Sequence, residues 1–104
     1  MANTSEGSIS RDGDADIRLE ATVTGRVQGV GFRYTARETA VGLGLVGEAV
    51  NLRNGSVRVV AEGSRRALDA LLEWLESDRT PGRVGSVEVL WVETKGDLSG
   101  FDTR

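Results

Sequence analysis

The chain contains no histidine and no cysteine, and these two absences narrow the chemistry that it can perform. Without cysteine there can be no disulfide, no thiolate nucleophile and no zinc–thiolate site. Without histidine the chain lacks the commonest general base and the commonest metal ligand. Serine–histidine–aspartate enzymes, cysteine–histidine enzymes and most transition-metal sites are therefore excluded. Any catalysis must rely on arginine, asparagine, carboxylates, hydroxyls or backbone groups.

The chain also lacks a long apolar run and an excess of positive charge. No apolar stretch approaches the ~20 residues of a membrane-spanning helix. The 13 basic residues are outnumbered by 16 acidic ones, for a net charge of -3. Binding to nucleic acid or to an anionic membrane depends on a positive field, so we expect neither partner. With 104 residues, 38% of them hydrophobic, the chain has room for one small domain.

Residues 1–16 are rich in Ser, Gly and Asp and show no hydrophobic period. Such a segment cannot bury enough apolar surface to offset its ordering entropy, so we predict a disordered tail followed by one domain over residues 17–104. The tail lacks the apolar segment that a signal peptide contains. The sequence therefore predicts a cytoplasmic protein.

From Ile17 onward the hydrophobic pattern predicts alternating strands and helices. Apolar residues alternate with polar ones in the first strand, whereas Phe32, Ala36 and Ala40 follow the spacing of one helix face. The predicted elements are, in order, a strand from Ile17 to Val27, a helix carrying Phe32 to Leu43, a strand from Val46 to Arg53, a strand beginning at Val57, a helix over 65–77, a strand from Val84 to Glu93 and a short edge strand within 100–104.

The predicted order is β-α-β-β-α-β. Two split βαβ units with right-handed crossovers produce an α+β, ferredoxin-like sandwich. We therefore expect a four- to five-stranded antiparallel sheet with two helices on one face. Asn54-Gly55 predicts a type I′ hairpin turn, and Ser64 is the expected N-cap of the second helix. This fold hosts many unrelated functions, so it does not identify one.

The segment that carries chemistry lies between the first strand and the first helix. Gly29 and Gly31 allow successive backbone N–H groups to point inward, next to the positive end of a helix dipole. A small tetrahedral anion fits such a nest, and Arg33 can add a planar, permanently charged fork. The same spacing is equally typical of a glycine-rich turn with an exposed arginine, and the pattern alone does not decide between the two.

The run GRVQGVGFR over residues 25–33 resembles the signature of the acylphosphatase family, small enzymes that hydrolyse carboxyl–phosphate bonds. The similarity extends over residues 17–104 and includes GLVG at 44–47, NGSV at 54–57, TPGRV at 80–84 and GF at 100–101. The resemblance implies a stand-alone acylphosphatase that acts on a small-molecule acyl phosphate. It also implies a monomer that needs neither a metal ion nor a cofactor.

The resemblance also implies roles for individual residues. Arg33 corresponds to the family's phosphate-binding arginine, and Asn51 to the catalytic asparagine that holds the attacking water. Glu48, Ala49 and Val50 stand where many members have an aromatic residue, a valine and a basic residue. We expect Glu48 and Val50 to affect the surface near the site, and Ala49 to affect packing beneath Asn51. The implied phosphate cradle, built mainly of backbone N–H groups, comprises Gln28, Gly29, Val30, Gly31, Phe32 and Arg33.

The alternative function is a non-catalytic ferredoxin-like module that binds a small anion or RNA. RNA binding on this fold usually relies on aromatic residues of the third strand, and residues 56–62 contain none. An anion sensor has no need of a group that positions water, so Asn51 favours the enzyme. No sequence feature identifies the acyl part of the substrate. Four carboxylates are expected on a solvated helix face, namely Glu62, Asp69, Glu73 and Glu76.

Overall fold

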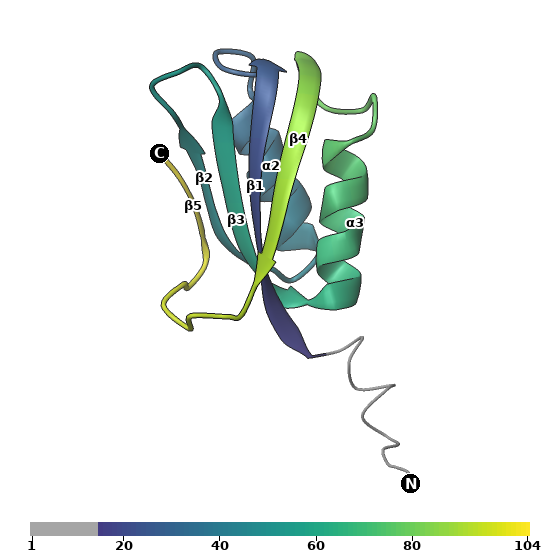
Figure 1. Ribbon diagram of the computed structural model, residues 1–104, viewed down its shortest axis with the longest axis vertical. Coiled ribbons are helices and arrows are strands. Elements are labelled where there is room, and N and C mark those ends of the chain that lie inside the picture. The colour runs from purple at the N-terminus through teal and green to yellow at the C-terminus, as the bar shows by residue number, and fades with distance from the viewer. Residues whose placement is uncertain (1–14) are drawn as a thin grey trace, which may run out of the picture.

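Residues 15–104 are described by a computed structural model, in which one five-stranded sheet is covered on one face by two helices (Figure 1). The strand order is β4-β1-β3-β2-β5. This arrangement confirms the predicted ferredoxin-like fold. The elements are β1 (Asp16–Arg26), α2 (Phe32–Gly42), β2 (Val46–Asn51), β3 (Val57–Ser64), α3 (Arg65–Leu75), β4 (Arg83–Val92) and β5 (Phe101–Thr103).

The sheet is mixed, so the prediction of a purely antiparallel sheet was wrong. β5 pairs with β2 in parallel, with Gly47 opposite Phe101 and Ala49 opposite Thr103. The reason lies in the connection after β4, because the chain crosses from one edge of the sheet to the other before it forms β5 (Figure 1). β5 thereby ends at the same end of the molecule as β2.

The connection between β2 and β3 is longer than the predicted two-residue turn. Asn51 pairs with Val57, so β2 ends two residues before the expected Arg53. Gly55 has a φ of 95°, but no non-glycine residue of the described chain has a positive φ, which excludes a type I′ turn. The Asn54 side chain instead accepts hydrogen bonds from the main-chain N–H and the hydroxyl of Ser56, at 3.1 and 2.6 Å.

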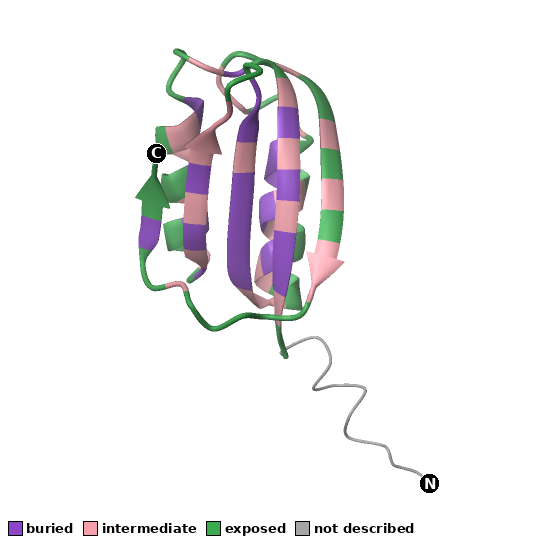
Figure 2. Cartoon of the chain, turned by 60° about the vertical axis from the view of Figure 1, so that its left-hand side comes forward, coloured by how far each residue is buried: buried purple, intermediate pink, exposed green. Residues whose placement is uncertain are grey.

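The core lies between the sheet and the helices, where the alternating residues of the strands are buried (Figure 2). The rings of Phe32 on α2 and Trp74 on α3 lie 5.8 Å apart and join the two helices. Ser64 caps α3 as predicted, since its Oγ accepts a hydrogen bond from the N–H of Ala67 at 3.1 Å. The helix ends at Leu75, two residues before the predicted end.

β1 begins at Asp16, which pairs with Ser64, so the strand includes one residue more than expected at its start. The tail predicted over residues 1–16 therefore overlaps β1 at Asp16. Its residues 1–14 lie outside the described part of the chain. Within residues 15–104, no helix has the length and apolar character needed to cross a membrane.

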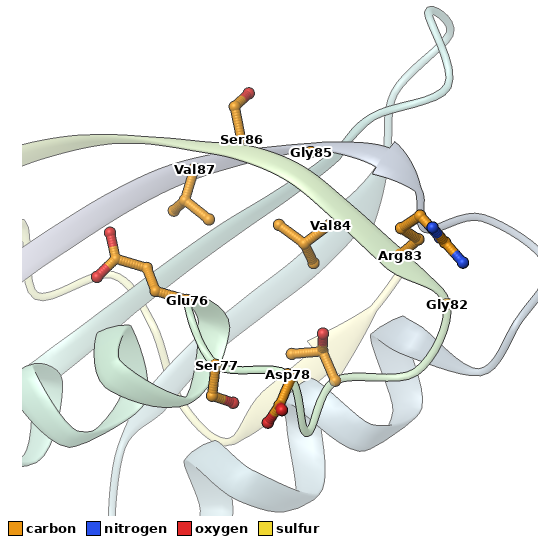
Figure 3. A pocket seen from close by; sticks show the side chains of 10 residues that line it. Glu76, Ser77, Asp78, Gly82, Arg83, Val84, Gly85, Ser86 and Val87 are labelled. Atoms are coloured by element: carbon orange, nitrogen blue, oxygen red, sulfur yellow. The ribbon is translucent and has the colours of Figure 1, made fainter.

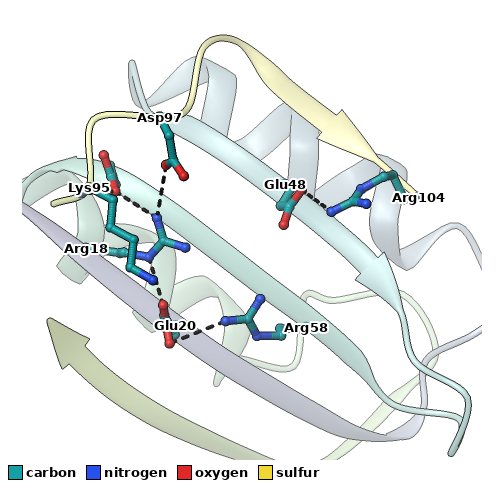
Figure 4. Close-up of polar contacts among 8 residues, drawn as sticks. Arg18, Glu20, Glu48, Arg58, Lys95, Asp97 and Arg104 are labelled. Carbon is teal, nitrogen blue, oxygen red and sulfur yellow. Dashed lines mark hydrogen bonds and ion pairs between the residues drawn. The ribbon is translucent and has the colours of Figure 1, made fainter.

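The sheet face without helices carries a buried ionic cluster (Figure 4). Arg18 is 7% exposed, and its guanidinium contacts Glu20 at 2.8 Å and Glu62 at 2.9 Å. Glu62 is 6% exposed and also accepts a hydrogen bond from the main-chain N–H of Lys95 at 2.9 Å. The prediction that Glu62 lies on a solvated helix face was wrong. It lies on β3, where it ties the segment between β4 and β5 to the sheet.

The ionic cluster makes stability depend on pH. Burial raises the pKa of Glu62, but hydrogen bonds from the Lys95 N–H and the Arg18 guanidinium outweigh burial, so its pKa lies below the ordinary value. The pKa of Glu20 is lowered mainly by its hydrogen bond with Arg18. A carboxylate whose pKa is lower in the folded state than in the unfolded state stabilises the folded protein. This contribution is complete when the pH is above the pKa of the unfolded state. That contribution is lost as the pH falls through the folded-state value.

We expect Glu62→Gln to lower the free energy of unfolding by about 2 kcal/mol near neutral pH, because Arg18 loses a buried charged partner. Urea unfolding between about pH 7 and about pH 2 measures the effect. The difference from wild type shrinks at the acidic end, where the wild-type carboxylate becomes protonated. Glu88→Gln, at an exposed position of β4, is the control and should change little. An equal loss in the control contradicts the prediction.

Candidate active site

The loop between β1 and α2 adopts the conformation that an anion cradle requires. Gly29 has a φ of 76° and Gly31 a φ of 82°, both in the left-handed region. A Cβ at either position has open space around it, so the backbone angle rather than crowding favours glycine there. Gly31 is the N-cap of α2, and no side chain caps this helix. The first N–H groups of α2 are therefore free to bind an anion.

Gln28 fastens the loop to the turn between β2 and β3. Its side-chain amide donates to the main-chain carbonyl of Leu52 at 2.8 Å and to that of Ser56 at 2.9 Å. The family resemblance predicts Gln28 only as a member of the cradle. This positioning role depends on the longer turn, whose two carbonyl groups face the loop.

Arg33 is the second residue of α2, and its guanidinium reaches the end of β5. Nη1 of Arg33 donates to the main-chain carbonyl oxygen of Arg104 at 2.8 Å. No ion pair with an aspartate or glutamate among residues 15–104 involves Arg33. The guanidinium is held beside the end of β5, and its other N–H donors can bind an anion.

Asn51, at the end of β2, is connected to Arg33 through the same carbonyl group. The N–H of Asn51 donates to the carbonyl oxygen of Arg104 at 2.8 Å, and the N–H of Arg104 donates to Ala49 at 2.9 Å. The side-chain oxygen of Asn51 is buried and has no hydrogen-bond partner among the described residues. A buried acceptor without a partner is costly, by about 1–3 kcal/mol. An O–H donor such as water matches this acceptor.

A hollow of about 140 Å³ opens beside the loop. Of the predicted cradle residues, Gln28 and Val30 lie outside the lining, and the Phe32 side chain is buried in the core. Phe32 can therefore contribute only its backbone to the cradle. Asn51 is also not part of the lining, and it is linked to Arg33, which does line the hollow, only through the main-chain oxygen of Arg104. The residues that line the hollow are Val27, Gly29, Gly31, Phe32, Arg33, Tyr34 and Thr103.

A larger cavity of about 560 Å³ lies between the end of α3 and the start of β4 (Figure 3). It contains none of the predicted site residues. Its lining includes the carboxylates of Glu76 and Asp78, which repel a phosphate group. We therefore place the candidate active site at the smaller hollow, where N–H donors and an arginine converge. In residues 15–104 there is no group of three or more metal-ligating His, Cys, Asp or Glu side chains.

Comparison with known proteins decides the family. The acylphosphatase family model matches residues 19–103. The chain belongs to the acylphosphatase family. An acylphosphatase of Thermobifida fusca is 53% identical over 88 residues, which cover 85% of this chain and 97% of the relative. An acylphosphatase of Streptomyces coelicolor is 51% identical over 90 residues, 86% of this chain and 97% of the relative.

Solved structures agree with this assignment. The structure of an acylphosphatase from Coxiella burnetii matches with a TM-score of 0.76 and 37% identity, over 86% of this chain and 93% of that one. The acylphosphatase from Bacillus subtilis has the same TM-score and 30% identity, over 85% and 98% of the two chains. The protein is thus an enzyme that hydrolyses acyl phosphates, as its family membership shows.

Two residues of β2 that precede Asn51 contact Arg104. Glu48 accepts a hydrogen bond from the Arg104 guanidinium at 2.6 Å (Figure 4). Ala49 is completely buried beneath the site, and its carbonyl group holds the N–H of Arg104. The Glu48 ion pair therefore acts on the residue whose carbonyl group contacts both Arg33 and Asn51.

Proposed function

We propose that this enzyme binds the phosphoryl group of an acyl phosphate in the loop Gln28–Arg33 and that Asn51 orients the attacking water. The observation that carries the proposal is the buried, unpartnered oxygen of Asn51, linked to Arg33 by the shared carbonyl group of Arg104. Backbone N–H groups bind the equatorial phosphate oxygens, and the Arg33 guanidinium adds its charge.

The proposed reaction is an in-line displacement at phosphorus. The water oxygen forms a bond to phosphorus while the bond between phosphorus and the acyl oxygen breaks, and the carboxylate departs with the electron pair. A carboxylate is a good leaving group and needs no strong general acid. The proton of the water passes to a phosphate oxygen of the substrate, since Asn51 cannot accept a proton at neutral pH. This route uses only groups that a chain without histidine and cysteine possesses.

We expect hydrolysis of benzoyl phosphate to proceed unchanged in excess chelator, because N–H groups and Arg33 stabilise the charge that a metal ion otherwise stabilises. Loss of the absorbance of benzoyl phosphate measures the rate with and without EDTA. Activity lost in EDTA and restored by a divalent cation contradicts metal independence. Absence of hydrolysis under both conditions contradicts the proposed function itself.

We further propose that the enzyme acts as a cytoplasmic monomer, without nucleic acid or membrane as a partner. The net charge of -3 supports this proposal, because both polyanionic partners require a positive field. β3 also contains no aromatic side chain on which a base could stack. Size-exclusion chromatography with light scattering tests the monomer.

A further inference from the structure

The end of β5 is a weakly supported part of the site. β5 has three residues, and within the described sheet it pairs with β2 alone. Arg104 follows it, and its main-chain oxygen accepts hydrogen bonds from the Asn51 N–H and from Nη1 of Arg33, both at 2.8 Å. A short segment at the edge of a sheet opens at a low cost in free energy. The position of this oxygen therefore depends on the contacts that hold Arg104.

The two faces of β5 have different surroundings. Phe101 is buried in the core and Thr103 lines the hollow, so the alternate residues, Asp102 and Arg104, project from the sheet face without helices. Figure 4 shows the Arg104 guanidinium directed at Glu48 of β2. The ion pair and the hollow thus lie on opposite sides of one backbone segment, and the main chain of Arg104 connects them.

Glu48 is placed to hold the Arg104 side chain. Its Oε1 lies 2.6 Å from Nη2 of Arg104, and the Glu48 side chain is 19% exposed whereas that of Arg104 is 64% exposed. A half-buried carboxylate is thus the anchor of an otherwise exposed arginine. Asp102 lies beside Glu48 in the parallel pairing of β5 with β2. Neighbouring carboxylates repel each other, and the Arg104 guanidinium offsets this repulsion where β5 meets β2.

We propose, on the basis of the function proposed above, that Glu48 is a positioning residue for the hydrolysis of acyl phosphates. By binding the Arg104 guanidinium, Glu48 keeps the main-chain oxygen of Arg104 in place. That oxygen in turn orients the Arg33 guanidinium and holds the main chain at Asn51. Glu48 does not line the hollow, so it acts through Arg104 and not on the substrate.

A purely electrostatic influence of the pair on the site predicts a different result. The Glu48 carboxylate repels a phosphate and the Arg104 guanidinium attracts it, so through the field alone Glu48→Gln strengthens phosphate binding and Arg104→Gln weakens it. Positioning predicts the same sign for both substitutions, because each of them breaks the same ion pair.

The test measures kcat and KM for benzoyl phosphate, and the inhibition constant of inorganic phosphate, in Glu48→Gln, Arg104→Gln and the double variant. Each single substitution lowers kcat/KM about threefold and raises the inhibition constant in a similar proportion, since a pair of this kind contributes up to about fivefold to an equilibrium. The double variant loses no more than the single ones, because the pair is already broken. Thermal unfolding verifies that all three variants remain folded.

The matched control breaks an ion pair elsewhere. Asp69→Asn removes the partner of Arg65 on α3, where the two side chains lie 3.1 Å apart, and α3 lies on the other side of the molecule from β5 (Figure 1). This variant leaves kcat/KM and the inhibition constant unchanged.

Opposite signs in the two single variants, unchanged constants in both, or additive losses in the double variant overturn the proposal. Failure of the proposed function has a different signature, which is a folded Arg33→Ala enzyme with wild-type turnover. If Arg33→Ala is impaired while Glu48→Gln equals wild type, the positioning role of Glu48 alone is wrong.

Discussion

Arg33→Ala is expected to lower kcat for benzoyl phosphate by about a thousandfold. Negative charge develops on the phosphoryl oxygens in the transition state. An arginine that contacts these oxygens raises kcat by about 10³-fold or more. The affinity for inorganic phosphate, measured by competitive inhibition, falls as well. The variant also loses the hydrogen bond to the Arg104 carbonyl oxygen, so thermal unfolding must accompany the kinetics.

Two further variants sharpen the test of Arg33. Arg33→Lys keeps the charge but lacks the planar fork, and we expect it to recover little of the lost rate. Arg37→Ala removes an exposed arginine four residues further along α2 and should leave kcat nearly unchanged. A folded Arg33→Ala enzyme with near-wild-type turnover refutes the assignment.

Asn51→Ala is expected to lower kcat by about 10²- to 10³-fold while inorganic phosphate binds with nearly unchanged affinity. In the proposed mechanism Asn51 contacts the water rather than the phosphoryl group, so its loss removes orientation in the transition state but not ground-state binding. Because its N–H bond to Arg104 belongs to the main chain, that contact survives the substitution. Initial rates and competitive inhibition by phosphate separate the two effects.

Loss of phosphate binding in Asn51→Ala contradicts the proposed role of Asn51. If a folded Asn51→Ala enzyme no longer binds phosphate, Asn51 belongs to the cradle and the water requires another positioning group. Asn51→Asp provides a second test, since it keeps an acceptor oxygen but adds a negative charge near the phosphoryl group. We expect this variant to weaken phosphate binding through repulsion, which Asn51→Ala does not do.

Much of the fold could be predicted because periodicity and caps are local properties. Alternation identified β1 to within one residue at its start, and the apolar stripe with Ser64 identified α3. The loop that carries Gly29 and Gly31 was also predictable, since only glycine readily adopts the positive φ observed there. The proposed roles of Arg33 and Asn51 rest on the family motif rather than on periodicity.

Other features depend on residues far apart in the sequence and are visible only in the folded chain. Glu62 was assigned to a solvated face because nothing near it reveals its partner Arg18, which is 44 residues away. The parallel pairing of β5 with β2 brings the Arg104 carbonyl oxygen to both Arg33 and Asn51, across 71 and 53 positions.

The element order, the glycines of the loop after β1 and the chemistry open to a chain without histidine and cysteine could be read from the sequence alone. The tertiary structure decided which charges are buried, how Gln28 holds the loop and that Glu48 binds Arg104. The physical reason is that backbone preference and hydrophobic period act over a few residues. Strand register, in contrast, is set by the burial of whole faces, so the partner of a charged or polar side chain emerges only when distant segments pair.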